Sequence, residues 1–209
     1  MEKGIKTKLY LVRHGSTAWN EVVRFRGSAD IPLSARGLKQ AEALANFLRD
    51  ARLSAIYTSP QRRAKNTAKI INKFHHLPIE ERPELKSVNY GKWEGKLEEE
   101  VARDYPQLYR EYIEHIESFR FPQGETLEDL KERALMVIKE GISNFEGGEI
   151  LVVSHQVVTR VLICALLDIS SSLYWQIGQD PGCLNIFEFF RGKFFLKLLN
   201  YCPKLGSEE

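Results

Sequence analysis

Apolar residues in this chain follow two alternating patterns, namely short continuous runs and longer stretches that are apolar on one face. The run Lys8–Val12 predicts a buried strand. A helix capped by Ser34 follows, and its apolar face consists of Leu38, Ala41, Ala45 and Leu48. Another strand is predicted at 54–58, followed by a helix from Pro60 to about Phe74.

The same alternation returns in the second half of the chain. Thr126 opens the capping box Thr-Leu-Glu-Asp, and the helix that it begins extends through Ile142. Gly147-Gly148 ends this helix before an apolar strand that leads to His155. One more helix is predicted after that histidine, with a face of Val157, Val158, Val161, Leu162, Ala165 and Leu166.

Two apolar runs near the end of the chain, 184–190 and 194–199, flank Arg191-Gly192-Lys193 and predict an antiparallel hairpin. Strands that alternate with helices are typical of a sheet covered by helices on both faces. The pattern therefore predicts a three-layer α/β/α sandwich with a mostly parallel central sheet. No repeat or linker interrupts it, so residues 1–209 are expected to form a single domain.

The first predicted strand ends in Arg13-His14-Gly15, which packing explains poorly. The planar guanidinium of arginine suits phosphate oxygens. Histidine is a nucleophile near neutral pH, and glycine lets the backbone come close to a bound anion. Together these residues indicate a phosphoryl group that Arg13 holds and His14 attacks.

Two further segments belong at the same edge of the sheet. His155 ends another predicted strand, and ligands of parallel sheets bind beyond the carboxyl ends of their strands. After the strand at 54–58, Ser59 is a predicted N-cap and Pro60 the first helical residue. Arg62 and Arg63 then fall near the positive end of the helix dipole, where cations are unfavourable unless an anion binds nearby.

Six segments match the motifs of one family in the right order: LVRHGSTAWN, RFRGSADIPLSARGLKQA, TSPQRRAKNTA, LKSVNYGKWEG, FPQGETLEDLKER and VVSHQVVTR. Over nearly its whole length the chain resembles the histidine phosphatase superfamily, also called phosphoglycerate mutase-like. The resemblance implies the corresponding fold, no cofactor, and a phosphate-binding role for Arg63, the arginine directly before the alanine. It also implies substrate contacts from Thr17, Asn20 and the Arg26-Gly27 turn.

Two positions depart from the family pattern. Gln156 stands where the family usually has glycine, and its amide can donate a hydrogen bond to phosphate. Ser87 occupies the place of the glutamate that usually serves as general acid, and serine cannot supply a proton as a carboxylic acid can. Glu94 or Glu84 replaces that acid, a water held by Ser87 does so, or the enzyme is slow on alkyl phosphates.

Composition and charge narrow the class of protein. A hydrophobic content of 43%, a charged content of 28% and a net charge of +2 are typical of a soluble globular protein and give no basic surface for nucleic acid. The start MEKGIKTK lacks the apolar core of a signal peptide, and no apolar stretch is long enough to span a membrane. Three widely spaced cysteines fit a reducing cytoplasm and no metal site, with Cys164 expected in the core.

The sequence also predicts where the remaining histidines and a segment rich in aromatic residues lie. His75, His76 and His115 lie in polar stretches and are expected at the surface, and residues 206–209 are expected to fray. Residues 89–125 break the alternation and contain seven widely spaced aromatic side chains: Tyr90, Trp93, Tyr105, Tyr109, Tyr112, Phe119 and Phe121. The segment is interpreted either as a helical lid that helps to choose the substrate or as helices with a small aromatic core, and both can hold.

These observations favour a metal-independent phosphomonoesterase that acts on a small phosphorylated metabolite through a phosphohistidine, as a monomer or homodimer. Arg13, Arg63 and a protonated His155 would supply the positive charge, so that no metal is required. His14 must be neutral, with its other nitrogen donating to a carbonyl. A phosphoglycerate mutase and a weakly active, phosphate-binding or regulatory homologue are the alternatives. Within the family, similarity to α-ribazole phosphatases and to phosphoserine phosphatases leaves the substrate open.

Overall fold

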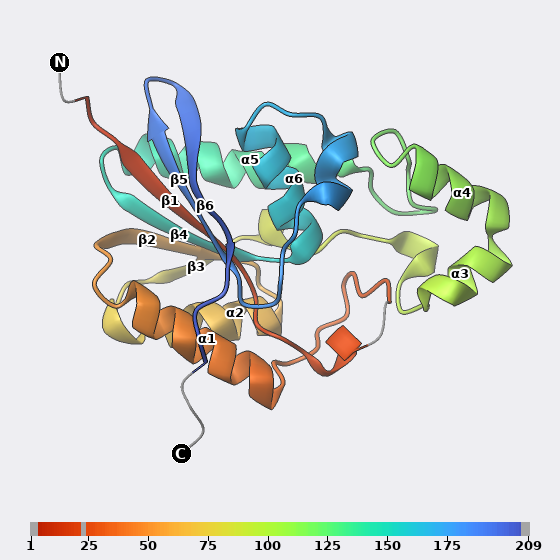
Figure 1. Ribbon diagram of the computed structural model, residues 1–209, viewed down its shortest axis with the longest axis horizontal. Coiled ribbons are helices and arrows are strands. Elements are labelled where there is room, and N and C mark those ends of the chain that lie inside the picture. The colour runs from red at the N-terminus through yellow and green to blue at the C-terminus, as the bar shows by residue number, and fades with distance from the viewer. Residues whose placement is uncertain (1–3, 22–23, 206–209) are drawn as a thin grey trace.

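A six-stranded sheet in the order β3-β2-β4-β1-β5-β6 forms the middle layer of the protein. Figure 1 shows the computed structural model, which describes residues 4–21 and 24–205. The first four strands run parallel to one another, whereas β5 and β6 are antiparallel to their neighbours. The strands are β1 (Thr7–Arg13), β2 (Leu53–Thr58), β3 (Ile79–Glu81), β4 (Glu149–Ser154), β5 (Leu184–Phe190) and β6 (Lys193–Tyr201).

Helices cover both faces of this sheet. The α-helices are α1 (Ala35–Leu48), α2 (Arg62–Ile71), α3 (Glu98–Asp104), α4 (Pro106–Glu114), α5 (Leu127–Asn144) and α6 (Gln156–Leu166). Short 3-10 helices lie at Ala18–Glu21, Asn72–Phe74, Pro83–Leu85, Gly91–Trp93 and Ser171–Gln176. In Figure 1, α1 and α2 lie against one face and α5 and α6 against the other.

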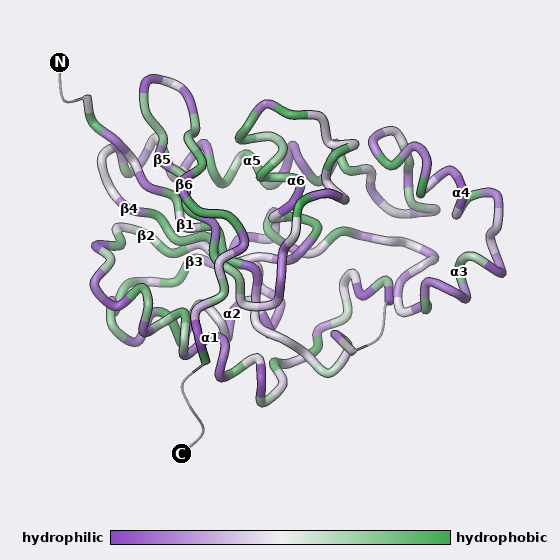
Figure 2. The backbone as a smooth tube through the Cα atoms, viewed as in Figure 1, coloured by the Kyte–Doolittle hydropathy of each residue, from purple (hydrophilic) through white to green (hydrophobic). Residues whose placement is uncertain are grey.

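The central strand β1 shows why the protein has three layers. Leu9 and Leu11 belong to the apolar cluster formed with α5 and α6, whereas Tyr10 and Val12 belong to the cluster formed with α1 and α2. Successive side chains of a strand point to opposite faces, so an uninterrupted apolar run buries both faces at once. Figure 2 shows the same contrast, with largely hydrophobic central strands and mostly hydrophilic outer helices α3 and α4. The predicted three-layer sandwich is confirmed.

Two helix starts and the hairpin agree with the sequence. The Ser34 hydroxyl accepts a hydrogen bond from the Gly37 amide at 3.2 Å and begins α1. Thr126 and Asp129 exchange reciprocal hydrogen bonds of 3.0 and 2.9 Å, which is the predicted capping box of α5. At the hairpin turn, Arg191 and Gly192 both have positive φ, the conformation that tight antiparallel turns require.

Other boundaries differ from the prediction. Helix α2 begins at Arg62, with Gln61 as its N-cap, so Ser59 and Pro60 were assigned wrongly. The Ser59 amide still bonds to the Val153 carbonyl at 3.0 Å, which keeps the chain extended past the end of β2. The sequence analysis missed strand β3 (Ile79–Glu81). This strand is only three residues long, it is partly exposed, and it contains no apolar run.

The segment 89–125 holds α3, α4 and an aromatic cluster. Its largest members, Trp93, Phe119 and Phe121, are almost fully buried, and they pack with Tyr112 and with Phe25 from the loop after β1. The expected aromatic core is therefore present, and it ties the helices to the N-terminal loop. The lid role stays a separate question.

The remaining expectations concern single residues. Cys164 is buried as expected, His76 and His115 are exposed, and His75 is half-buried rather than at the surface. Residues 206–209, expected to fray, lie outside the described residues. Within the described chain, no helix is both long and apolar enough to cross a membrane.

Backbone contact between α1 and the loop after β1 yields a stability prediction. A Cβ on Gly37 would lie 2.1 Å from the Ser16 carbonyl oxygen. This oxygen belongs to the backbone, so no side-chain rotation can relieve the clash. Gly37→Ala should therefore lower the free energy of unfolding by about 1–3 kcal/mol, the usual cost of overpacking. Urea unfolding measures this, with Leu38→Ala as the exposed control on the same helix turn. A Gly37→Ala protein as stable as the parent would contradict the close approach.

Candidate active site

Three polar segments meet at the carboxyl edge of the parallel strands. The register of β1 and β4 pairs Arg13 with Ser154, so the residues that follow, His14 and His155, become neighbours. Their ring centroids lie 5.1 Å apart at an interplanar angle of 63°. From the first turn of α2, Arg63 brings its Nε to 3.2 Å from His14 Nε2. The side chains of these two histidines and of Arg13 and Arg63 are all buried.

The hydrogen bonds of His14 define its protonation state. Its Nδ1 lies 2.6 Å from the carbonyl oxygen of Gly15, which can only accept, so Nδ1 carries a hydrogen. Its Nε2 accepts from Arg63 and is therefore unprotonated. Burial, followed by repulsion from Arg63 and Arg13, holds the pKa of His14 well below its ordinary value. Both observations favour a neutral ring whose Nε2 lone pair accepts the Arg63 hydrogen bond.

The surroundings of His155 favour the neutral form of its ring in this structure, whereas the protonated form was expected with phosphate bound. Its Nε2 lies 2.8 Å from the Ser59 hydroxyl. Burial and the nearby positive charge of Arg63 hold the pKa of His155 well below its ordinary value. Its Nδ1 is buried and has no hydrogen-bond partner among the described residues. A buried polar atom without a partner is costly, and an arriving anion could share a proton with it.

The two buried arginines remain charged. Burial lowers the pKa values of Arg13 and Arg63 to about 10, which leaves both protonated at neutral pH. Arg13 donates from Nη1 to the Gln179 carbonyl, whereas its buried Nε has no partner among the described residues. The Arg63 guanidinium donates to Ala29 O at 2.6 Å as well as to His14. Arg62, by contrast, is exposed and contacts the site only through its backbone amide.

Arg13 also lines a cavity of about 410 Å³. Three of the expected substrate contacts, Asn20, Arg26 and Gln156, line it together with Arg13. Thr17 is buried beneath, where its hydroxyl and amide both bond to Asn20 Oδ1 at 2.8 and 2.7 Å. Thr17 therefore holds the Asn20 side chain in place from below the cavity.

The turn at Gly27 connects the cavity to the buried arginine. Gly27 has a positive φ of 40°, and its carbonyl accepts from Arg63 Nη2 at 3.3 Å and from the Gln61 side chain at 3.1 Å. Gly27 therefore contacts Arg63, and of the two turn residues only Arg26 is among the described residues that line the cavity.

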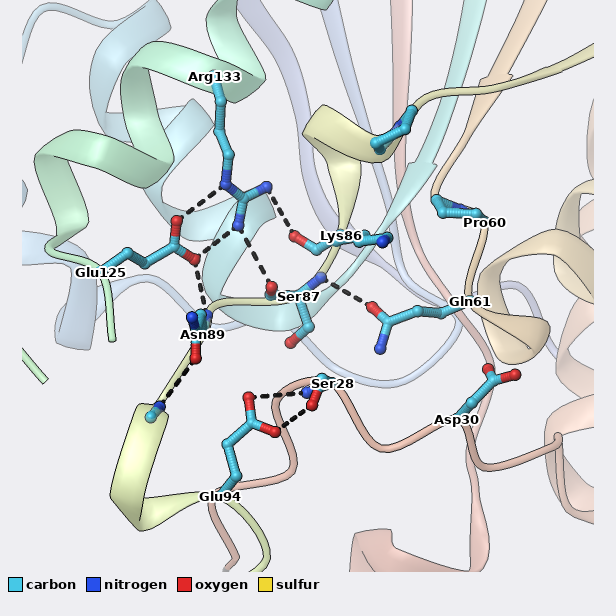
Figure 3. Close-up of a pocket in the computed structure, with 12 residues that line it drawn as sticks. Ser28, Asp30, Pro60, Gln61, Lys86, Ser87, Asn89, Glu94, Glu125 and Arg133 are labelled. Carbon is cyan, nitrogen blue, oxygen red and sulfur yellow. Dashed lines mark hydrogen bonds and ion pairs between the residues drawn. The ribbon is translucent and has the colours of Figure 1, made fainter. Parts of the chain in front are cut away.

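Ser87 lies in a second cavity, of about 680 Å³, which Figure 3 shows in close-up. The Ser87 amide donates to Gln61 Oε1 at 2.8 Å, so Gln61 links this cavity to the Gly27 turn. Three carboxylates share the cavity: Asp30, Glu94 and Glu125. They are the groups on this face that can replace the missing general acid.

The three carboxylates differ in their surroundings. Glu125 is paired with Arg133 at 2.7 Å, and Glu94 accepts hydrogen bonds from the Ser28 amide and hydroxyl. Asp30 accepts from the Arg62 amide at 2.6 Å, and its charge partly offsets the lowering of the Arg63 pKa that burial causes. Glu84 pairs instead with Arg82 and does not line the cavity.

Asp30 was missed by the sequence analysis. Its only signal there was its position within the segment RFRGSADIPLSARGLKQA, because nothing in a single sequence shows that this loop folds back onto α2.

Comparisons with known proteins agree with this geometry. Residues 9–201 match the model of the histidine phosphatase superfamily (branch 1). The chain belongs to this superfamily. Phosphoserine phosphatase 1 of Hydrogenobacter thermophilus is 34% identical over 96% of the chain and 95% of its own length.

Two solved structures share the fold of this histidine phosphatase. Bacillus stearothermophilus YhfR has a TM-score of 0.85 and 32% identity over 91% of this chain and 95% of its own. The α-ribazole phosphatase of Shigella flexneri has a TM-score of 0.85 and 28% identity over 97% and 100%. The predicted family and reaction class, hydrolysis of phosphate monoesters, are thus confirmed.

The two adjacent arginines of α2 give a matched pair of variants. Arg63 is buried against His14 and Arg62 is exposed, so only the first should stabilise charge in the transition state. Arg63→Ala should lower kcat/KM for p-nitrophenyl phosphate on the order of a hundredfold or more, and Arg62→Ala much less. The reverse order would show that the wrong arginine has been assigned to the phosphate.

The two neutral histidines also make stability depend on pH. Their pKa values are lowered in the folded protein, whereas in the unfolded chain they titrate at about 6.5. Above that pH both histidines are neutral in the folded and the unfolded protein, so the free energy of unfolding does not change with their titration. Below it the unfolded chain binds protons that the folded protein does not, so the free energy of unfolding falls by up to about 1.4 kcal/mol per pH unit for each histidine.

Urea unfolding across this range tests the linkage. His155→Asn should make the fall in stability below about pH 6.5 shallower, because one of the two titrating groups is gone. His115→Asn, at an exposed position, is the control and should follow the parent protein. If the parent and the His155→Asn protein show the same slope, His155 is not held neutral by its surroundings.

Proposed function

We propose that this protein is a metal-independent phosphomonoesterase that hydrolyses a small phosphorylated metabolite through a phosphohistidine at His14 Nε2. The observation that carries the proposal is the neutral, buried His14, whose Nε2 lone pair faces the Arg63 guanidinium. A phosphate bonded to Arg63 and Arg13 would replace His14 as the acceptor of the Arg63 Nε hydrogen, which would free the lone pair to attack phosphorus. Phosphate binding and attack are then achieved by one arrangement of side chains.

The reaction proceeds in two displacements. His14 Nε2 forms a bond to phosphorus while the ester P–O bond breaks, and the leaving oxygen takes a proton to become an alcohol. Water then attacks the phosphohistidine, the N–P bond breaks, and the proton lost by water returns to the group that served as acid. Inorganic phosphate and the original enzyme result. The Gly15 carbonyl keeps Nδ1 protonated throughout, so the attacking nitrogen stays defined.

Fixed cations stabilise the charge that spreads over the equatorial oxygens. Arg13 and Arg63 are buried and charged, and a phosphate dianion would favour protonation of His155 when it arrives. Among the described residues, no group of three or more His, Cys, Asp or Glu side chains is placed to hold a metal. The donors that are present suit phosphate directly.

A small metabolite fits the surroundings of this centre. The cavity of about 410 Å³ is of a size for a small molecule, and relatives are named for phosphoserine and for α-ribazole phosphate. Tyr90 and Tyr112 of the segment 89–125 line the same cavity, which supports a lid role for that segment. We place the protein in the cytoplasm, where its three free cysteines would stay reduced.

Trapping of the covalent intermediate tests the proposal. The protein is mixed with a radiolabelled phosphate monoester in excess chelator and denatured during turnover. Acid-labile, base-stable label should appear on His14, and turnover should continue without metal. His14→Ala should abolish both, while His115→Ala, at an exposed position, should leave both unchanged. Full turnover by His14→Ala, or loss of activity that magnesium restores, would overturn the mechanism.

Ser87 generates a prediction about leaving groups. A positioned acid typically contributes about a hundred- to ten-thousandfold, and it matters least when the leaving group is already a stable anion. We therefore expect relatively good turnover of p-nitrophenyl phosphate and slow turnover of alkyl phosphates. Ser87→Glu should raise activity on alkyl phosphates.

The neighbouring carboxylates are the matched controls. If alkyl phosphates are turned over at ordinary rates and Ser87→Glu only impairs the enzyme, another group is the acid. Asp30→Asn and Glu94→Gln then identify it, because the variant that lacks the true acid should lose activity on alkyl phosphates and largely keep it on p-nitrophenyl phosphate.

A further inference from the structure

Two cysteines continue the line of Arg13 across the sheet to its edge. The Arg13 amide donates to the Cys183 carbonyl at 3.1 Å, so Cys183 lies opposite the last residue of β1, just before β5 begins. In the next ladder Leu184 pairs with Tyr201, so the residues one step further along, Cys183 and Cys202, are opposite each other. Directly opposite residues of antiparallel strands point to the same face of a sheet. Arg13, Cys183 and Cys202 therefore form a row on one face.

The backbone bonds of Cys183 show which kind of pair it makes with Cys202. Its carbonyl accepts from Arg13, and its amide donates to the Asp180 carbonyl at 3.1 Å, so neither group bonds to β6. The two cysteines are thus a non-hydrogen-bonded pair, for which the Cα atoms lie about 4.5 Å apart. A disulfide needs a Cα separation of about 4.4–6.8 Å. The backbone therefore permits a disulfide between Cys183 and Cys202.

The charges around the two thiols agree with this placement. Burial raises the pKa of Cys183 to about 12, whereas Arg13 opposes the rise and Cys202 adds to it. Burial, followed by the Asp180 charge, raises the pKa of Cys202, and Arg13 again opposes the rise. Both thiols are therefore protonated at neutral pH and add no negative charge beside Arg13. Because neither thiolate is stabilised, a disulfide would form slowly at neutral pH and would resist reduction once formed.

The two thiols differ in their access to solvent. Cys202 is exposed and lines a cavity of about 610 Å³ at the end of β6, whereas Cys183 is fully buried. A reagent in solution therefore meets Cys202 first. Cys183 then lies directly behind it, in the position of a resolving thiol.

A disulfide at this pair would change the support of the phosphate site. The Cys183 thiol donates to Gln179 Oε1 at 3.3 Å, and the Gln179 carbonyl accepts from Arg13 Nη1. A disulfide sulfur has no hydrogen to donate, so the bond to Gln179 is lost when the disulfide forms. The same segment also bonds to the nucleophile, because the Gly182 amide donates to the His14 carbonyl at 3.0 Å.

We propose that Cys183 and Cys202 are a modification site, at which a low-molecular-weight disulfide oxidises the two thiols to an intramolecular disulfide and weakens phosphate binding at Arg13. The Cys202 thiolate attacks the reagent, an S–S bond forms, and one thiol of the reagent leaves. The Cys183 thiolate attacks the Cys202 sulfur, and the second thiol leaves. Two electrons and two protons thus pass from the cysteines to the reagent. The crosslink goes beyond the proposed function, whereas its effect on phosphate rests on that function.

Oxidised glutathione tests the site. The protein is incubated with it at mildly alkaline pH, denatured and labelled with N-ethylmaleimide. One label, on Cys164, should be found instead of three, and mass spectrometry should show peptides joined through Cys183 and Cys202. The dissociation constant of inorganic phosphate, measured by calorimetry, should rise about threefold or more, as expected when one supporting hydrogen bond is lost. Dithiothreitol should reverse both changes.

Two cysteine variants are the controls. Cys202→Ser, at an exposed position, should form no crosslink and keep its phosphate affinity after oxidation, whereas Cys164→Ser should behave like the parent protein. Glutathione that stays on Cys202 while Cys183 remains free, or a crosslink that leaves phosphate affinity unchanged, would overturn the proposal. Neither result affects the proposed function, which fails only if p-nitrophenyl phosphate is not hydrolysed or His14 is not labelled.

Discussion

The burial of two charged arginines against two uncharged imidazoles is the constraint on which this protein depends. Arg13 and Arg63 are buried, and no carboxylate of the described residues forms an ion pair with either of them. Their charge favours the neutral form of both histidines. In addition, Arg13 Nε and His155 Nδ1 have no hydrogen-bond partners among the described residues. In the proposed reaction, a phosphate dianion would bond to all of these groups at once.

The scaffold holds this unfavourable arrangement through backbone contacts. Parallel pairing of β1 with β4 brings His14 and His155 side by side, and the close approach of Gly15 to Gly37 anchors the loop after β1 on α1. The Ser59 amide bonds to the Val153 carbonyl, and the Ser59 hydroxyl lies 2.8 Å from His155 Nε2. The positions that hold the site therefore come from distant parts of the chain, and the apolar strands between them supply the rigidity.

The sequence alone was sufficient to predict the layers of the fold and the meeting of His14, His155 and Arg63 at one edge of the sheet, because strand periodicity and strand-end position follow local rules. Other features depend on contacts that no local pattern reveals. Ser59 and Pro60 look like a helix start, yet pairing with β4 keeps the chain extended there. The charge state of His155 depends on burial beside arginines from other segments, and the proximity of Asp30 depends on a loop that folds back.

The central claim is that His14 is neutral, with its hydrogen on Nδ1 and its lone pair on Nε2. Nitrogen NMR of isotope-labelled histidine in the ligand-free protein measures this state directly, since the two ring nitrogens have distinct shifts when protonated and unprotonated. The account predicts an unprotonated Nε2 and a protonated Nδ1 at neutral pH, with no titration near the ordinary histidine pKa of about 6.5. A His14 ring that titrates at that pH, or that carries its single hydrogen on Nε2, would contradict it.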